Sequence, residues 1–347
     1  MKDLFDNKIL IITGTYPPEI CGAGDYTYKL METKIANDWQ LYYPSNWNIN
    51  TISKKINEIN NTLIKNINMQ YPTNGYKRSL LPHLLCIYYS FFTKKRFSVT
   101  IHECSQLGIR AKFAVFIFLL FSNRIIFTNI FEMKYASRFV PFLSRKSTVI
   151  KIYTNIEASK DIKPILDRNY DLVSFGLIRQ KKGLEEFIEV AQKLKTNIPT
   201  VKIILTGKIQ PECKDYSSQL LNNSDSYLEE TFFNKEEKEV ANILANSKIA
   251  YLPFPDGVSE RRGSAMAILK NGCMLITTKG EFTTKGFDSC CDYANNIDEA
   301  FIIIKKILLR DELYFRQKQL DICNFLENDL PESWEEVATS YFNFLCK

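Results

Sequence analysis

Residues 252–278 read LPFPDGVSERRGSAMAILKNGCMLITT. The stretch leaves an apolar strand, passes through an irregular loop into a helix expected at 263–270, turns at Asn271-Gly272 and enters a second strand. This order is typical of α/β layers with a parallel sheet, in which ligands bind at the carboxyl ends of the strands. We therefore predict a pocket lined by Ser259, Glu260 and the backbone amides near Gly263 and Ser264. The alternative for Glu260 is a helix-start carboxylate that only accepts from backbone amides.

Strand-like and helix-period segments alternate through the rest of the chain, which favours an α/β fold with parallel sheets. A length of 347 residues suits two domains. We place a first domain at 1–167, a second domain at 168–330 and an amphipathic helix in the final segment, 331–347. Residues 47–69 suggest one amphipathic helix without a function. The expected strands are 8–14, 39–43, 97–102, 124–128, 148–152, 171–175, 201–206, 249–254 and 274–278.

A glycine-containing loop follows the first expected strand, in the sequence TGTYPPEICGAGDYT from residue 13 to residue 27. Gly22, Ala23 and Gly24 stand where a helix begins, and backbone amides at such a place bind anions. The loop lacks the third glycine of a dinucleotide-binding fingerprint. It is either an anion-binding loop or a plain turn from strand to helix.

A second strand-to-helix loop, FGLIRQKKGL at 175–184, carries the cations Arg179, Lys181 and Lys182. Basic residues just before a helix oppose the positive end of its dipole, and a bound anion would relieve that conflict. Charge-assisted hydrogen bonds to such an anion contribute about 1.5–3 kcal/mol each, more than the dipole penalty. The alternative is a solvated basic turn.

Charge is distributed unevenly along the chain. The net charge is +6 overall, yet residues 1–168 are strongly basic and residues 169–347 are acidic. The nine cysteines form no C-x-x-C pair, which favours a reduced, cytoplasmic protein. Residues 1–13 do not have the pattern of a signal peptide, and the longest apolar run, 113–121, is too short to span a bilayer. No Asp-x-Asp motif occurs, so we expect no metal ion and no cofactor at the site.

Taken together and in order, the three loops resemble those of the GT-B glycosyltransferases, in particular the retaining family 4. YPPEICGAGDYT is similar to that family's donor-facing glycine loop, GLIRQKKG to its diphosphate-binding segment, and VSERRGSAMAILKNG to its E-x7-E region. The resemblance implies two Rossmann-like, doubly wound domains that face a central cleft, with the last helix crossing back to the first domain. The domain at 1–167 would be on the acceptor side and the domain at 168–330 would bind the nucleotide sugar. It implies no metal, a UDP- or GDP-sugar donor, and cationic stabilisation of the leaving diphosphate.

The resemblance also implies roles for individual residues. Arg179 and Lys182 would hold the diphosphate, with Lys181 as a substitute, and Glu260 would face the donor sugar. His102, which ends a strand in TIHE, matches the histidine beside the transferred sugar. The chain departs from the pattern at residue 268, where isoleucine replaces the glutamate that binds the ribose.

The S-E-R-R-G-S wording resembles a branch associated with bacterial surface polysaccharide. We therefore expect transfer of a hexose or N-acetylhexosamine to a lipid-linked saccharide in O-antigen, lipopolysaccharide or capsule assembly. Basic clusters such as 94–96 beside apolar stretches predict peripheral contact with an anionic inner membrane face, unless those stretches are ordinary buried helices. A catalytically silent GT-B scaffold is the alternative. A dehydrogenase and a nucleic-acid-binding protein rank below it, because the chain has no dinucleotide fingerprint and no nucleic-acid recognition motif.

Overall fold

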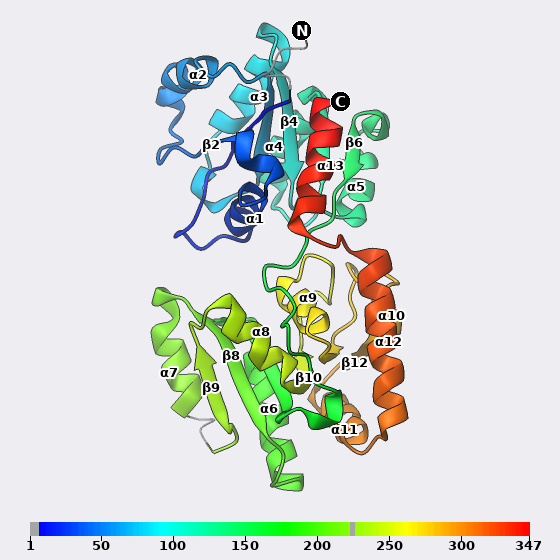
Figure 1. The fold of residues 1–347 in the computed structure, drawn as a ribbon. Helices are drawn as coiled ribbons and strands as arrows, with labels where there is room; N and C mark the ends of the chain where they lie inside the picture. The colour runs from blue at the N-terminus through cyan, green and yellow to red at the C-terminus, as the bar shows by residue number, and fades with distance from the viewer. Residues whose placement is uncertain (1–6, 223–225) are drawn as a thin grey trace. The chain divides into compact units, whose positions relative to one another are not determined.

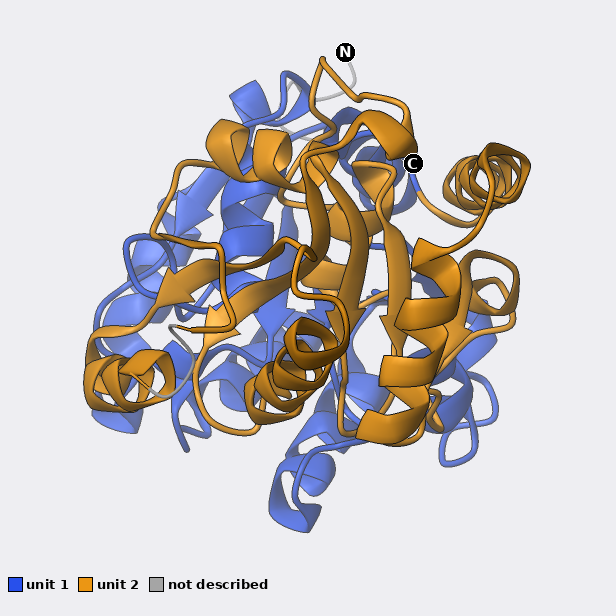
Figure 2. Ribbon diagram, turned by 90° about the horizontal axis from the view of Figure 1, so that it is seen from below, with its two compact units in different colours: residues 1–153, 331–347 blue, residues 154–330 orange. Residues whose placement is uncertain are grey.

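The structure is a computed structural model that describes residues 7–222 and 226–347, so the first six residues of the segment tested for a signal peptide lie outside it. The chain forms two compact units, one of residues 1–153 with 331–347 and one of residues 154–330 (Figures 1 and 2). The division thus lies before residue 168, the boundary expected from the sequence, and the segment 154–167 belongs to the second unit.

The first unit contains a six-stranded parallel sheet in the order β2-β1-β3-β4-β5-β6. Its strands are β1 (Ile9–Ile12), β2 (Gln40–Tyr42), β3 (Asn66–Tyr71), β4 (Arg96–Ile101), β5 (Arg124–Phe127) and β6 (Ser147–Val149). Its α-helices are α1 (Gly22–Met31), α2 (Ile52–Asn60), α3 (Leu81–Phe92), α4 (Ile109–Phe121), α5 (Ile130–Ser137) and α13 (Trp334–Cys346).

Alternation along the strands divides the first sheet into two faces. Leu10 and Ile12 point to the face that packs against α2, α3, α4 and α5. Ile9 and Ile11 point to the other face, where α1 and α13 cover the sheet (Figure 1). Helix α13 begins after Ser333, whose side chain accepts a hydrogen bond from the backbone of Glu336.

The second unit repeats this plan with the strand order β12-β11-β10-β7-β8-β9, all parallel. Its strands are β7 (Tyr170–Ile178), β8 (Ile203–Ile209), β9 (Glu230–Phe233), β10 (Ser247–Leu252), β11 (Met274–Thr277) and β12 (Cys291–Tyr293). Its α-helices are α6 (Leu184–Asn197), α7 (Lys214–Asn222), α8 (Glu237–Ala245), α9 (Gly263–Lys270), α10 (Phe287–Cys290), α11 (Ile297–Leu308) and α12 (Glu312–Asp329).

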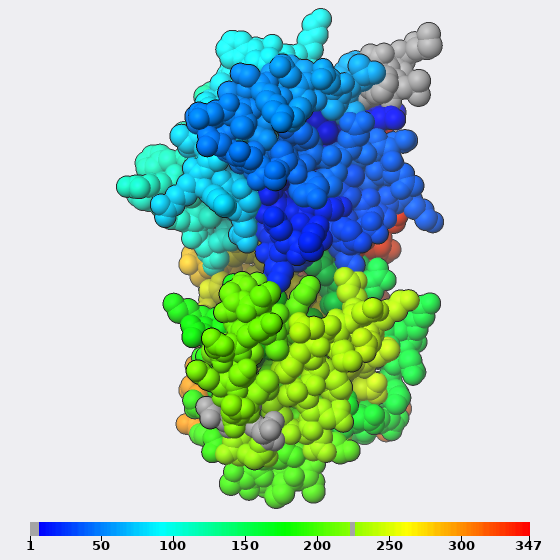
Figure 3. All heavy atoms as spheres, turned by 90° about the vertical axis from the view of Figure 1, so that its left-hand side faces the viewer, coloured from blue at the N-terminus to red at the C-terminus, as the bar shows by residue number. Residues whose placement is uncertain are grey.

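Helices also cover both faces of the second sheet. Leu172 and Leu205 pack towards α6 and α11, whereas Val173 and Ile204 pack towards α8, α9 and α12. The edge strand β9 and the neighbouring α7 lie on the side of this unit that faces the viewer in Figure 3, in green and yellow-green.

The fold class predicted from the sequence is confirmed: two doubly wound α/β units are each built on a parallel sheet. The prediction of one helix over 47–69 is wrong, because α2 ends at Asn60 and β3 begins at Asn66. Strands β9 and β12 were also missed. Among the described helices, none combines the length and apolarity needed to cross a bilayer.

Candidate functional site

The loop between β7 and α6 positions the predicted cations of the second unit. It makes a tight entry into the helix through Gly183, whose φ of 76° lies in the left-handed region. A Cβ at Gly183 would lie 2.4 Å from the Pro253 carbonyl oxygen, so only glycine lets this loop pack against the segment after β10. Arg179 and Lys181 are exposed, whereas Lys182 is half-buried.

Lys182 lies in a concentration of positive charge. Burial lowers the pKa of Lys182 to about 8, and repulsion from Arg179 and Arg262 adds to the effect. Arg262, at the entry to α9, also forms an ion pair with Asp256, and its guanidinium lies 4.9 Å from the centre of the Phe254 ring. The cluster therefore comprises Arg179, Lys182 and Arg262, and it would favour a ligand with negative charge.

Arg262 was missed by the sequence reasoning, which assigned no role to the Arg261-Arg262 pair. The signal was present, because two arginines just before a helix create the same conflict with the helix dipole as Arg179 and Lys182 do. Arg261 lies differently, with its guanidinium 5.3 Å from the centre of the Phe282 ring.

The cations lie at the point where the order of the second sheet reverses. Strand β7 pairs with β8 on one side and with β10 on the other, and the helices that follow β7 and β10 cover opposite faces. Such a switch point leaves a crevice at the carboxyl edge, where α/β sheets bind ligands. Helix α9 begins there, and the side chain of its N-cap residue, Arg262, makes no capping hydrogen bond to the first turn. A Cβ at Gly176 would come within 3.9 Å of Ser264 at the start of this helix.

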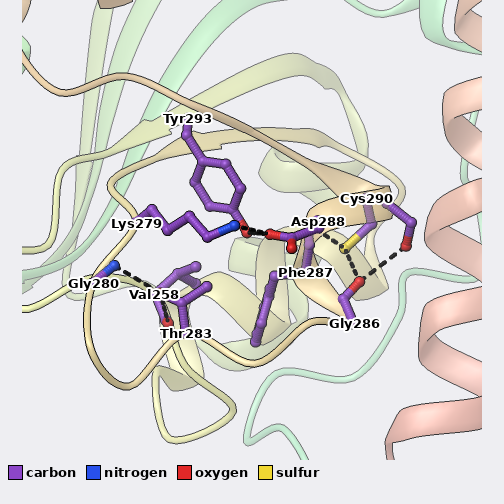
Figure 4. Close-up of polar contacts among 10 residues, drawn as sticks. Val258, Lys279, Gly280, Thr283, Gly286, Phe287, Asp288, Cys290 and Tyr293 are labelled. Atoms are coloured by element: carbon purple, nitrogen blue, oxygen red, sulfur yellow. Dashed lines mark hydrogen bonds and ion pairs between the residues drawn. The ribbon is translucent and has the colours of Figure 1, made fainter.

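Ser259 and Glu260 belong to the loop between β10 and α9, and both are buried, with 6% and 4% of their surfaces exposed. The loop after β11 contacts the backbone of Val258, the residue directly before Ser259, as Figure 4 shows. Thr283 Oγ1 accepts from the Gly280 amide at 3.0 Å and donates to the Val258 carbonyl at 2.8 Å. The loop that carries Glu260 is therefore held at Val258 by a second loop of the same unit.

Figure 4 also shows how the loop after β11 is anchored at its far end. The Asp288 carboxylate accepts from Lys279 Nζ at 2.7 Å and from the Tyr293 hydroxyl at 2.9 Å. These contacts tie α10 to the ends of β11 and β12. None of the three residues belongs to the predicted site.

Ile268, the residue at the departure from the family pattern, is fully buried in the core beneath α9. It packs in the same cluster as Val173, Leu252 and Phe287. This side chain contributes to stability and is not placed to touch a ligand.

In the first unit, His102 directly follows β4. Its ring Nε2 lies 2.9 Å from Gln70 Oε1, and the ring packs edge-on against Tyr26 with the centroids 4.9 Å apart. Burial lowers the pKa of His102 to about 4, so the imidazole is neutral at pH 7.

The glycine loop of the first unit lies close to His102 through α1. Tyr26, which contacts the His102 ring, is in the first half of α1, and Gly22, Ala23 and Gly24 form its first turn. A Cβ at Gly24 would lie 3.0 Å from the Thr15 carbonyl oxygen, so glycine permits the close approach of the loop after β1. The N-cap, Cys21, makes no side-chain hydrogen bond to the helix.

A chain of buried polar side chains runs from His102 along β3 and β4. Gln70 Nε2 donates to Asn68 Oδ1 at 2.6 Å, Asn68 Nδ2 donates to Ser98 Oγ at 3.1 Å, and Ser98 Oγ donates to the Ile67 carbonyl at 2.6 Å. A carbonyl only accepts, so the last bond fixes the direction of the others. Gln70 must therefore present its oxygen to His102, which carries its proton on Nε2.

The same polar group reaches α13. Thr100 Oγ1 donates to Asn68 Oδ1 at 3.1 Å and lies 2.8 Å from the Tyr341 hydroxyl, which in turn accepts from Tyr26 at 3.1 Å. Burial raises the pKa of Tyr341 to about 12. The C-terminal helix, β3, β4 and α1 are thus joined beneath His102 by hydrogen bonds.

The predicted site residues fall into two groups, one in each unit. In the second unit, the segments after the adjacent strands β7 and β10 carry the predicted residues, at the carboxyl ends of these strands: Arg179, Lys181, Lys182, Ser259, Glu260, Gly263 and Ser264. The first unit brings together His102, Gly22, Ala23 and Gly24.

No protein-family model matches the sequence, and no curated protein matches it. Solved structures do. A glycosyltransferase from Rickettsia africae superposes with a TM-score of 0.69 at 13% identity, covering 97% of both chains. HepE from Anabaena, solved with UDP and glucose, gives a TM-score of 0.67 at 12% identity and covers 97% of this chain and 99% of that one.

A plant structure has the same architecture. The catalytic domain of starch synthase IV from Arabidopsis thaliana, bound to ADP and acarbose, gives a TM-score of 0.58 at 10% identity and covers 97% of this chain and 98% of that one. The fold is that of the GT-B glycosyltransferases. At these identities the likeness establishes the architecture, and the chemistry has to be argued from the residues of this chain.

Proposed function

We propose that this protein is a glycosyltransferase that takes a hexose or N-acetylhexosamine from a UDP- or GDP-sugar and transfers it to a lipid-linked saccharide, with retention of configuration. Two of the GT-B structures that match the whole chain were solved with a nucleoside diphosphate, UDP in one and ADP in the other. Assembly of a bacterial surface polysaccharide is the process that we propose for it, on the resemblance of its S-E-R-R-G-S segment.

The observation that carries the proposal is the cation cluster at the switch point of the second sheet. The bond to be broken joins the sugar to a diphosphate, and the leaving group carries the charge that develops. Arg179, Lys182 and Arg262 would neutralise that charge, and the backbone amides in the first turn of α9 would add hydrogen bonds. In this proposal the cations do the work for which other transferases use a divalent ion.

Further roles are proposed for the buried carboxylate and for the first unit. Glu260 would accept hydrogen bonds from the donor sugar, in a loop that the Thr283 contacts keep in place. His102 would present its unprotonated Nδ1 to the transferred sugar, because Gln70 occupies its Nε2. The amides of Gly22 to Gly24 would face the donor from α1.

The test is a panel of nucleotide sugars, measured for binding by calorimetry and for hydrolysis or transfer by release of the nucleoside diphosphate. Arg179→Ala should weaken all donors of the panel alike, by roughly 10- to 100-fold, because it removes a charge-assisted bond to the shared diphosphate. Glu260→Ala should weaken binding of the nucleotide sugar more than binding of the free nucleoside diphosphate. Lys181→Ala is the control for loss of a nearby charge. Undiminished diphosphate affinity in Arg179→Ala would show that the cation is misassigned.

A catalytically silent GT-B scaffold is the second candidate. The identity of residue 268 favours it, because an isoleucine stands where the family that the sequence resembles has the carboxylate that holds the ribose. The calorimetric panel separates the two candidates. A protein that binds none of the donors is a scaffold, whereas one that binds a donor and turns it over is a transferase.

A further inference from the structure

The first unit contains a cavity of about 600 Å³ between α4 and α5. Its walls are mainly apolar, with Ile109, Phe113 and Phe116 from α4 and Phe139 from the end of α5. Its volume is typical of sites that hold organic ligands. The polar groups in the lining are few, and Lys112 Nζ already donates to the Tyr135 hydroxyl at 2.8 Å. The cavity therefore suits an aliphatic ligand.

The walls of the cavity are strongly exposed to solvent. Ile109, Phe113 and Phe139 have 74%, 71% and 59% of their surfaces exposed. Ile109 and Phe113 are one turn apart on α4. Large apolar side chains that gather around an open cavity are unusual on the surface of a monomeric protein and mark a binding surface.

The apolar surface extends beyond the cavity to α3. The Phe121 ring at the end of α4 contacts the Phe91 ring at a centroid distance of 5.3 Å, and Phe91 is 61% exposed. Phe92 beside it is 72% exposed. We call the residues Ile109, Phe113, Phe139, Phe91 and Phe92 the apolar patch.

The exposed charges on the two helices that form the cavity are positive. The exposed charged side chains of α4 and α5 are Arg110, Lys134 and the residue after α5, Arg138. The acidic residue of α5, Glu132, is fully buried and accepts from the backbone of Cys104 and Ser105 at 2.9 and 2.8 Å. Its carboxylate thus holds the loop after His102 and is not presented to a ligand.

We propose that the cavity binds one aliphatic chain of an anionic membrane phospholipid, and that the apolar patch lies in the interface of the bilayer. Basic residues beside exposed phenylalanines meet both parts of such a surface, because the cations attract anionic headgroups and the aromatic rings enter the acyl region. Charge complementarity selects the bilayer over a protein partner of mixed charge. The inference concerns attachment and stands whether or not the protein transfers a sugar.

The first experiment measures flotation of the full chain with vesicles of phosphatidylcholine, with and without phosphatidylglycerol. We expect binding to the anionic vesicles and at least ~10-fold weaker binding to the neutral ones. Phe113→Asp should weaken binding at least ~10-fold, whereas the control Leu313→Asp should leave it unchanged. Leu313 is a matched control because it is 74% exposed, close to the 71% of Phe113, and lies on α12 in the second unit. Each of Arg110→Ser, Lys134→Ser and Arg138→Ser should weaken binding roughly 5-fold.

The second experiment locates the acyl chain. Tryptophan placed by Phe113→Trp should be quenched by phospholipids brominated along the acyl chains, whereas Leu313→Trp should not. The native tryptophans, all buried, supply the same background in both variants. Absence of vesicle binding by the wild-type protein, or equal binding by Phe113→Asp, would overturn the proposal. So would a wild-type dimer that Phe113→Asp converts to a monomer, because the patch would then join two copies of the chain.

Discussion

Nε2 of His102 lies 2.9 Å from Oε1 of Gln70, and the hydrogen bonds beyond Gln70 leave that amide only one orientation. The chain of donors ends at the backbone carbonyl of Ile67, so every member of it is oriented by an atom that cannot donate. A neutral histidine with a fixed tautomer presents the same acceptor nitrogen, Nδ1, to whatever lies in front of it. Gln70 is in this sense a positioning residue for His102.

Replacing Gln70 should change the state of His102 in two distinguishable ways. Gln70→Glu places a carboxylate against Nε2 and should raise the pKa of His102 from about 4 by roughly 1–3 units, because an opposite charge favours the imidazolium. Gln70→Leu removes the acceptor and should allow a mixture of tautomers. ¹⁵N NMR reports both effects, and His83 is the only other histidine in the chain. An unchanged Nε2–H tautomer in Gln70→Leu would contradict the assignment.

The lowered pKa of Lys182 predicts that affinity for a nucleoside diphosphate depends on pH. Lys182 has a pKa of about 8 in the free protein, and a bound diphosphate would raise it. Binding then takes up a proton above pH 8, so affinity should fall as the pH rises from 8, by at most about 10-fold per unit. Lys182→Arg should abolish this fall, because arginine stays charged. Calorimetry with UDP between pH 7 and 9.5 provides the measurement.

Calorimetry with UDP also distinguishes Lys182 from its neighbour, Lys181. Lys182→Met should weaken UDP binding by about 10- to 100-fold at pH 7, as expected for one charge-assisted bond. Lys181→Met removes an exposed cation from the same loop and should cost less than about 3-fold. Equal losses in the two variants would mean that the loop acts through its net charge and not through Lys182.

Both histidines should make the protein sensitive to mild acid. Burial lowers the pKa of His83 and of His102 to about 4, whereas both titrate near 6.5 in the unfolded chain. The unfolded state therefore binds more protons between these values, so the free energy of unfolding is highest above pH 6.5 and falls as the pH drops towards 4. Each histidine should contribute about 2 kcal/mol of the loss between pH 7 and pH 5.

His83 offers the sharper test of that pH dependence. Its ring packs 4.6 Å from Phe118 and 5.3 Å from Tyr71, centre to centre, so His83→Phe keeps an aromatic ring among aromatic rings. Urea unfolding of this variant at pH 7 and pH 5 should show about half the wild-type loss of stability. An identical pH dependence in the variant would mean that His83 is not the group that titrates.

The sequence predicted five of the six strands of the first unit and failed at β3 for a physical reason. Strand β3 reads NINMQY, an alternation of polar and apolar residues, yet its polar residues are buried. Asn68 and Gln70 belong to the hydrogen-bonded chain beneath α13, which brings Tyr341 from the other end of the sequence. Local sequence patterns do not indicate that polar side chains will form hydrogen bonds with residues distant in the sequence. The Asn- and Ile-rich segment 47–69 therefore predicts a helix where the structure has α2 followed by β3.

The candidate site was predicted to a similar extent. Loops after strands are recognisable from glycines and charges, and Lys182 and Glu260 do follow the carboxyl ends of β7 and β10. The part played by Arg262 depends on where α9 begins relative to Lys182, which is a matter of tertiary packing. Ile268 is likewise buried because the face of α9 that carries it turns to the core. A single substitution in a motif does not indicate which face of the helix will be buried.

Ile268→Glu tests whether a carboxylate at this position would bind the ligand or would only disturb the core. Ile268 has no exposed surface and lies in the core with Leu252 and Phe287, so a carboxylate there would be buried among apolar side chains. We expect a loss of at least ~3 kcal/mol in the free energy of unfolding at pH 7, whereas the control Ile268→Val should cost about 1 kcal/mol. The pKa of the new carboxyl should rise, so its penalty is complete above that raised pKa and vanishes as the pH falls below ~4. Urea unfolding at pH 7 and pH 4.5 measures both effects. A variant as stable as the wild type that binds UDP more tightly would show that this side chain reaches the nucleotide after all.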